Sequence, residues 1–271
     1  MQRASRNPGP HLNVCAASTF ATIIPVNNHG SAFLHRPAAN VSMSLYSPKA
    51  DPKYQWDAAP TPDLHQNSEP NTIADKVTIS PDTLRAERLP PGQFRTRKWP
   101  VLHATTVPQI DQSQWTLTLT GLLSQPTSFT LDEFQRLPRS KVFADFHCVT
   151  KWSRLGNLWE GVRLSWLLQQ HGLHPEAKYL TVAAYDGQWT TNIPLREAMA
   201  DDVLLASHHD GEPLSPDHGG PVRLVVPRLF AWKSAKWVRC IHVTSDNEPG
   251  YWEQKGYHDV GDPWTEQRFR D

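Results

Sequence analysis

Apolar and polar residues follow regular patterns from about Arg85 onward, and their periods predict the elements there. Residues 115–120 alternate apolar with polar side chains, as a strand with one buried face should. Thr130 and Glu133 have the spacing of a capping box, which predicts a short helix after Thr130. Pro138 is expected to end this helix, because proline cannot donate the next backbone hydrogen bond.

Further along the chain, a helix and a hairpin are expected in succession. Apolar residues at helical spacing predict a helix over residues 164–171, and Gly172 is a natural terminator. Residues 179–184 and 188–193 read as two strands joined by a turn at residues 186–187, whose Asp-Gly sequence is typical of hairpins.

The remaining signals are those of one short helix and several short strands. Pro194 favours a helix start, and residues 203–206, 222–226 and 237–243 have the composition of strands. Strands dominate and do not alternate regularly with helices, so the fold class is expected to be α+β, a β-rich mixed domain.

Residues 1–84 differ from residues 85–271, which are expected to form the single folded domain. The early segment is rich in Pro, Asn, Ser and Ala, and ten of the eleven tryptophans lie beyond it. Such a composition buries too little apolar area to offset chain entropy, so disorder is predicted. Residues 1–50 contain no acidic residue, as in a transit peptide, although Pro8 and Pro10 oppose an early amphipathic helix. A cytoplasmic location is expected, with a mitochondrial one as the alternative.

The overall charge excludes some classes of partner. The chain has 27 basic and 27 acidic residues, and therefore no positive field of the kind that nucleic-acid or anionic-membrane binding requires. No apolar run approaches the roughly 20 residues needed to cross a bilayer, so a soluble protein without a membrane span is expected.

One cysteine stands out as a candidate for chemistry. Cys148 follows His147 in a segment crowded with aromatic and basic residues, whereas Cys15 lies in the early extension and Cys240 in an expected buried strand. A thiolate is both a nucleophile and a soft metal ligand, so Cys148 could serve in either role.

A second candidate cluster lies downstream of the cysteine. His218 and Arg223 flank a Gly-Gly-Pro loop before one expected strand, and Lys233, Ser234 and Lys236 precede another. Loops at strand ends commonly hold ligands, and these side chains suit phosphate oxygens. A surface with scattered positive charge remains the alternative interpretation of these residues alone.

Taken together, four segments in the same order resemble the sulfite oxidase family of molybdenum–molybdopterin oxidoreductases. They are RTRKWPVLH from Arg95, HCVTKWS with NLWEGV around Cys148, DDVLLASHHDGEPLSPDHGGPVRLVVP from Asp201, and WKSAKWV from Trp232. The resemblance covers residues 88–265 and extends to short members that consist of the molybdopterin-binding domain alone.

The resemblance implies a role for particular residues of this chain. Cys148 would be the ligand to molybdenum, and the cofactors would be molybdenum and molybdopterin. A phosphorylated pterin needs cationic donors at one end, and its metal needs a soft thiolate at the other. The pterin contacts implied by the match are Arg97, His218, Arg223, Ser234, Lys236 and, through its backbone, Ala235.

Neighbouring residues carry weaker expectations. His147 is expected to be a core histidine rather than a group acting at the metal, and residues 208–210 a polar turn rather than a metal cluster. Tyr251 and Trp252 fall near the place where the family has an aromatic residue beside the metal, although the local spacing differs.

Two departures from the family pattern affect the expected substrate and partner. Sulfite-oxidising members carry a basic residue five positions after the cysteine, where this chain has Ser153, with Arg154 adjacent. Arg154 is therefore the candidate for orienting a sulfite- or sulfoxide-like substrate at the catalytic Cys148 site. The chain is too short for the family's haem domain, so electrons are expected to pass to or from a separate, unidentified donor or acceptor.

The leading hypothesis is a molybdopterin-dependent oxidoreductase that moves an oxygen atom to or from a small substrate. One alternative is a module that binds the cofactor without turnover. Another is a hydrolase with Cys148 as nucleophile, for which His147 is a poor base because neighbouring residues of a strand face opposite ways.

Overall fold

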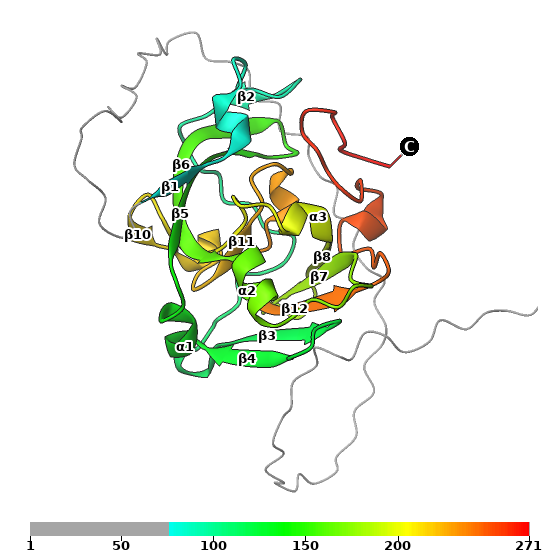
Figure 1. The fold of residues 1–271 in the computed structure, drawn as a ribbon. Helices are drawn as coiled ribbons and strands as arrows, with labels where there is room; N and C mark the ends of the chain where they lie inside the picture. The colour runs from blue at the N-terminus through cyan, green and yellow to red at the C-terminus, as the bar shows by residue number, and fades with distance from the viewer. Residues whose placement is uncertain (1–75, 271) are drawn as a thin grey trace, which may run out of the picture. The chain divides into compact units, whose positions relative to one another are not determined.

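The computed structural model describes residues 76–270, in which strands predominate over helices (Figure 1). The strands are β1 (Val77–Ile79), β2 (Phe94–Arg95), β3 (Thr116–Gly121), β4 (Thr127–Thr130), β5 (Ser140–His147), β6 (Trp152–Arg163), β7 (Tyr179–Ala184), β8 (Thr190–Pro194), β9 (Leu204–His209), β10 (Glu212–Pro213), β11 (Arg223–Val225) and β12 (Val238–Thr244). The helices are α1 (Leu131–Gln135), α2 (Leu164–Gln170) and α3 (Leu195–Ala198), with short 3-10 turns between elements. The expected α+β class is confirmed.

The larger sheet carries the cysteine segment. Its strands follow the order β1-β5-β6-β9-β10, while β2 pairs with β6 and β11 pairs with β9. Strands β5 and β6 form a long antiparallel hairpin in which His147 pairs with Ser153 and Phe146 with Arg154. Arg223 on β11 pairs with Ala206 on β9. One sheet therefore holds both the cysteine hairpin and the strand that bears Arg223.

The smaller sheet has five strands in the order β4-β3-β12-β7-β8. Strand β12 lies between β3, to which it is parallel, and β7, to which it is antiparallel. The alternation predicted for residues 115–120 is present, because the even and odd side chains of β3 differ in burial. The predicted hairpin is also present, with β7 and β8 paired from Tyr179↔Pro194 to Ala183↔Thr190.

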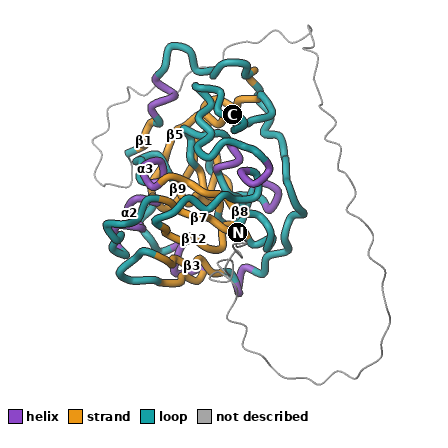
Figure 2. Tube along the Cα trace, turned by 90° about the vertical axis from the view of Figure 1, so that its right-hand side faces the viewer, coloured by secondary structure: helices purple, strands orange, loops and turns teal. Residues whose placement is uncertain are grey.

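The described residues form two apolar clusters, of which the larger packs the two sheets together and the smaller contains Cys148. The larger cluster takes Leu117 and Ile241 from the smaller sheet together with Val162 and Leu205 from the larger one. The smaller cluster comes from the larger sheet and includes Cys148. Much of the chain around the strands is loop, which Figure 2 shows as the teal part of the trace. The strand framework thus positions long loops that carry most of the candidate site.

The predicted helix signals are confirmed in detail. Thr130 and Glu133 form the capping box reciprocally at the start of α1. Helix α2 ends at His171, followed by Gly172 at a φ of 68°. Helix α3 begins directly after Pro194, as expected.

The fold includes residues that the sequence prediction assigned to the extension. Strand β1 pairs in parallel with β5, and the 3-10 turn Pro81–Leu84 follows it, ahead of the predicted boundary at residue 85. A strand of three residues is too short to produce a periodic signal, which is why the sequence did not indicate it. The rest of the predicted extension, residues 1–75 with Cys15, lies outside the described residues. Among residues 76–270, no helix is long and apolar enough to cross a bilayer.

Candidate functional site

Cys148 lies in the tight turn that connects β5 to β6. The turn closes through a hydrogen bond of 2.8 Å from the Cys148 N–H to the Trp152 carbonyl and one of 3.0 Å from the Lys151 N–H to the Cys148 carbonyl. Lys151 adopts a φ of 75°, in the left-handed region that such a turn requires. Since both flanking strands are paired within the sheet, the position of the sulfur is fixed by rigid backbone.

The Cys148 side chain is buried yet surrounded by groups that favour its thiolate. Burial raises the pKa of the Cys148 thiol, and the Thr150 hydroxyl and the positive charges of Arg268 and Lys236 act in the opposite direction. The Thr150 hydroxyl donates to the Cys148 sulfur at 3.2 Å. A metal cation would displace the thiol proton outright, so this environment suits a metal-bound thiolate.

His147 faces away from Cys148, as the strand geometry predicts. The His147 ring is fully buried, and its Nδ1 lies 2.8 Å from the Ser153 hydroxyl. Burial lowers the pKa of His147 to about 4, so the ring is neutral at physiological pH. Its Nε2 has no partner among the described residues, so this core histidine is only half satisfied. His147 is therefore not placed to act as a base for Cys148.

Arg223 is a buried cation with neutral partners. Its guanidinium donates to the carbonyls of His218 at 2.9 Å and Ser234 at 3.0 Å, and more weakly to that of Leu224. Arg223 is 2% exposed, and burial lowers its pKa to about 9. Within residues 76–270 no carboxylate forms an ion pair with it. A buried charge that lacks a counter-ion within the protein favours binding of an anion.

An aromatic cluster connects Arg223 to the cysteine. The guanidinium lies 5.3 Å from the ring centre of Phe146 and 5.6 Å from that of Trp159. Both rings belong to the same buried cluster as Cys148. The predicted metal ligand and the predicted phosphate contact are thus brought to one face of the larger sheet.

His218 packs beside the Arg223 guanidinium. Its ring stacks on Trp99 with centres 3.8 Å apart, and its Nε2 donates to the Trp99 carbonyl at 3.3 Å. The His218 Nδ1 lies 3.1 Å from the Ser215 hydroxyl, and burial lowers the pKa of the ring. Arg97 is exposed two residues before Trp99 in the segment that enters this region.

Lys236 contributes a second cation to the same region. Its ammonium donates to the carbonyls of Leu102 at 3.0 Å and Asp217 at 2.7 Å, and to His103 Nδ1 at 3.0 Å. Burial, with the charge of Arg223 as the next contribution, lowers the pKa of Lys236 to about 7. A nearby anion would reverse this shift by stabilising the charged ammonium.

The two residues before Lys236 present mainly backbone. Ser234 is buried, and its hydroxyl oxygen accepts from the Val226 N–H at 3.0 Å. Ala235 is fully buried, and its carbonyl accepts from the Leu224 N–H at 2.8 Å. The structure thus gathers His218, Arg223, Ser234, Ala235 and Lys236 around one loop cluster.

Lys233 differs from the expectation that both lysines of this segment face a phosphate. Its ammonium is fully buried and lies 2.5 Å from Glu253 Oε1, with further bonds to the backbone and side-chain oxygens of Asn192 at 2.8 and 2.9 Å. Trp232 Nε1 donates to the same carboxylate oxygen at 3.1 Å. Lys233 is therefore a structural ion-pair partner, because the chain turns it into the protein on the opposite side from Lys236.

Arg154 has protein partners for its guanidinium. Its Nη2 donates to Asp210 Oδ2 at 2.7 Å, and its Nη1 donates to His209 Nε2 at 2.9 Å and also contacts Asn157. The polar turn expected at residues 208–210 falls at Asp210 and Gly211, which have positive φ, whereas His208 and His209 belong to β9. Nothing in these contacts brings Arg154 to the sulfur, so its role toward a substrate stays a prediction.

Three residues of the region were not singled out as site residues from the sequence. The His209 ring centre lies 4.2 Å from that of Trp99 and 4.5 Å from that of Trp159. Tyr257 packs at 4.9 Å from Trp252, and burial, together with the nearby Cys148 charge, raises the pKa of its phenol. Arg268 lies close enough to Cys148 to affect the thiol pKa. The sequence signal for Tyr257 is its nearness to the expected aromatic pair. His209 was considered within residues 208–210 and assigned to a polar turn, and Arg268 has no sequence signal.

The donor set fits a molybdopterin cofactor. A buried sulfur with a single hydroxyl partner can supply the soft ligand for the metal, and two cations without carboxylate partners can supply the phosphate end. Among the described residues, no cluster of three or more His, Cys, Asp or Glu side chains offers an alternative metal site. The other ligands of the metal would therefore have to come from the cofactor rather than from a cluster of these side chains.

Comparison with known proteins agrees with this geometry. Residues 103–252 match the model of the oxidoreductase molybdopterin binding domain. The chain is 47% identical to the oxidoreductase YuiH of Bacillus subtilis over 67% of this chain and 92% of that protein. The chain belongs to this family, which places it among the sulfite oxidase-type molybdopterin oxidoreductases. It is an enzyme, and its cofactor is molybdopterin with molybdenum.

More distant relatives match part of their own length. A protein of Azospira oryzae named as a subunit of a protein-methionine-sulfoxide reductase, YedZ1, is 31% identical over 57% of this chain and 58% of its own. Inducible nitrate reductase 2 of Glycine max is 30% identical over 55% of this chain and 20% of its own. The solved sulfane dehydrogenase SoxCD of Paracoccus pantotrophus aligns with 55% of this chain and 42% of that one, with a TM-score of 0.49 and 27% identity.

Proposed function

We propose that the enzyme transfers an oxygen atom to or from a small sulfite- or sulfoxide-like substrate, with Cys148 as the protein ligand to molybdenum. The observation that carries the proposal is that the buried Cys148 lies in the same cluster as Phe146 and Trp159, the two rings on which the buried Arg223 guanidinium packs. Arg223 and Lys236 would bind the phosphate end of the cofactor, with Arg97, His218, Ser234 and the Ala235 backbone beside them. The cofactor supplies the two-electron chemistry at the metal.

The balance of the overall reaction shows that the enzyme must exchange water, protons and electrons with its surroundings. Oxidation of a sulfur substrate takes one oxygen atom from water and releases two protons and two electrons. Reduction of a sulfoxide is the reverse, consuming two protons and two electrons and forming water. Either direction requires a separate electron carrier, and relatives named for methionine sulfoxide and nitrate reduction support the reductive direction.

A Cys148-dependent hydrolase is less well supported by the contacts. The hydrogen bond to the sulfur comes from Thr150, and His147 is bonded to Ser153 on the other face of the hairpin. Nucleophilic cysteines usually require an adjacent base within hydrogen-bond reach.

Metal analysis of the purified full chain tests the proposal. Protein made in a host that synthesises molybdopterin should contain about one molybdenum per chain, and Cys148→Ala should contain almost none. Ser165→Ala is the matched control, because Ser165 is buried to a similar degree but lies in α2. Wild-type protein that lacks molybdenum, or a Cys148→Ala variant that retains it, would refute the assignment.

The reaction direction needs a separate assay. The loaded enzyme should oxidise reduced viologen dye when a sulfoxide is added, or reduce ferricyanide when sulfite is added. Loaded enzyme that does neither would remove sulfur oxides and sulfoxides from the proposal while leaving the metal site intact.

A further inference from the structure

The position five residues after Cys148, which is basic in sulfite-oxidising members of the family, carries no cation in this chain. Ser153 occupies the position five residues after Cys148, and its hydroxyl contacts His147 at 2.8 Å on the other face of the hairpin. Arg154 is on the cysteine face of the sheet, but Asp210 compensates its charge at 2.7 Å. Within the turn this leaves the exposed Lys151 as the cation without an ion pair among the described residues, and a buried cation for an anion at the sulfur would have to come from another segment.

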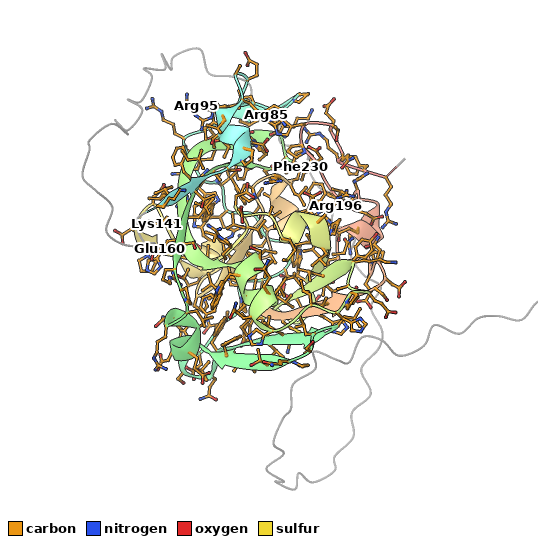
Figure 3. The ribbon with its side chains drawn as sticks, in the orientation of Figure 1. Arg85, Arg95, Lys141, Glu160, Arg196 and Phe230 are labelled. Atoms are coloured by element: carbon orange, nitrogen blue, oxygen red, sulfur yellow. The ribbon has the colours of Figure 1, made fainter. Side chains whose placement is uncertain are left out.

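The C-terminal segment supplies such a group. Arg268 Nη1 donates to the carbonyl of Val149, the residue after Cys148, at 2.5 Å. The Arg268 guanidinium carbon lies 4.8 Å from the ring centre of Phe230, a residue that Figure 3 labels. The hydrogen bond and the ring fix the guanidinium beside the cysteine turn.

One donor atom of this guanidinium is left without a partner. Arg268 Nη2 is buried, yet it makes no hydrogen bond to any of the described residues. Glu266 acts on Arg268 through its charge, but the two do not form an ion pair within residues 76–270. A buried cationic donor without an acceptor destabilises the protein more than the loss of an ordinary hydrogen bond does. A ligand that accepts a hydrogen bond from this donor would remove the destabilisation.

Other unpaired donors of the described residues differ from this one. The buried Arg139 Nη1 and Arg163 Nε belong to side chains that pair with Glu160 and Asp201, and the buried Arg239 Nε belongs to β12. Arg268 differs because its guanidinium also bonds to the carbonyl of Val149, the residue directly after Cys148.

We propose that Arg268 binds the oxyanion of the substrate beside Cys148, in place of the basic residue that sulfite-oxidising members carry five positions after the cysteine. The ligand class is a small oxyanion with at least two acceptor oxygens, which a guanidinium can engage through two parallel N–H groups. The inference rests on the proposed function, because it assigns the substrate to the space next to the predicted metal ligand.

Binding of an unreactive anion to the loaded enzyme tests this assignment. Sulfate is the probe, titrated calorimetrically into full-length holoenzyme, in which bound cofactor fills the Arg223 and Lys236 region. Arg268→Gln should weaken sulfate binding about tenfold or more, because hydrogen bonds to charged groups are the strong ones. Arg270→Gln is the matched control, as Arg270 lies two residues away and pairs with Asp259 at 2.6 Å.

The outcomes separate this inference from the proposed function. Molybdenum content is measured on the same samples and decides the metal site, whatever the sulfate result. Equal sulfate affinity in Arg268→Gln and Arg270→Gln, or no sulfate binding by the wild type, would overturn the role of Arg268. Arg268→Lys keeps the charge but loses the paired N–H donors of the planar guanidinium. The sulfate affinity of this variant should therefore fall between those of the wild type and Arg268→Gln. That variant also decides the matter if Arg268→Gln does not fold.

Discussion

Replacing Arg223 with methionine should weaken cofactor binding while leaving the stability of the cofactor-free protein almost unchanged. The guanidinium is buried against three neutral carbonyls and has no carboxylate partner among the described residues. In the cofactor-free protein its charge is a cost, whereas in the loaded protein it would pair with an anion. Arg223→Met removes the charge and keeps an apolar side chain that can pack on Phe146 and Trp159.

The magnitude follows from the depressed pKa of Arg223. Burial lowers that pKa from the ordinary value of an arginine to about 9. At 1.36 kcal/mol for each pKa unit, the folded cofactor-free protein carries a penalty of about 5 kcal/mol for this charge. The substitution removes the penalty but also removes three hydrogen bonds, each worth about 1 kcal/mol, and leaves buried carbonyls unpaired. The two effects nearly cancel, so the free energy of unfolding should change by less than about 2 kcal/mol.

The assay combines urea unfolding of cofactor-free protein with metal analysis of loaded protein. Arg223→Met should retain near-wild-type stability at pH 7 but less than about a tenth of the molybdenum. Arg196→Met is the control, because Arg196 is exposed on α3 and should affect neither quantity (Figure 3). A loss of stability above about 4 kcal/mol, or wild-type molybdenum content in Arg223→Met, would refute the reasoning.

The pH dependence of the same pair of proteins gives a second check. Below pH 9 the Arg223 guanidinium is charged in both the folded and the unfolded chain, so the penalty is fully present. Above about pH 9 the folded chain holds fewer protons than the unfolded chain, and wild-type stability should rise relative to Arg223→Met. A stability difference that does not change with pH would contradict the buried-charge account.

Two further substitutions test the framework around the site. Glu253→Gln leaves the buried Lys233 ammonium without its carboxylate and should lower the free energy of unfolding by about 3–5 kcal/mol, measured by urea unfolding; a loss below about 1 kcal/mol would exclude a charged pair. Gly219→Ala should destabilise the protein by about 1–3 kcal/mol and reduce its molybdenum content, because Gly219 has a φ of 101° and a new Cβ would lie 2.9 Å from that of Lys236. Wild-type thermal stability and metal content in Gly219→Ala would show that the loop can relax.

The sequence predicted the smaller sheet better than the larger one. Strands β3 and β7 bury one face, so buried and partly exposed residues alternate along them and the pattern is readable. Strands β5 and β6 are buried along much of their length, and their pairing shifts between Ala144 and Phe146. Both features remove the alternation, so the longest hairpin of the fold had no periodic signal.

The site shows the same division between local and distant information. Cys148 and the loop from His218 to Arg223 could be predicted as site residues, because the order of residues within each short segment is characteristic. The separation of Lys233 from Lys236 depends on Glu253, which lies on a later segment and accepts only one of the two ammonium groups. Arg268 approaches Cys148 only because the C-terminal segment returns to the β5–β6 turn. Such contacts between distant segments leave no trace in spacing or composition.

The division of the site between two stretches of chain has a consequence for how the enzyme is matured. Cys148 belongs to the β5–β6 turn, whereas Arg223 and Lys236 belong to the region from β11 to the start of β12. A molecule anchored at both places acts as a tether across the domain and strengthens the native state in proportion to the logarithm of its affinity. Empty chains, which also carry the unrelieved charge of Arg223, should be cleaved by proteases in preference to filled ones, giving a cell a physical basis for quality control.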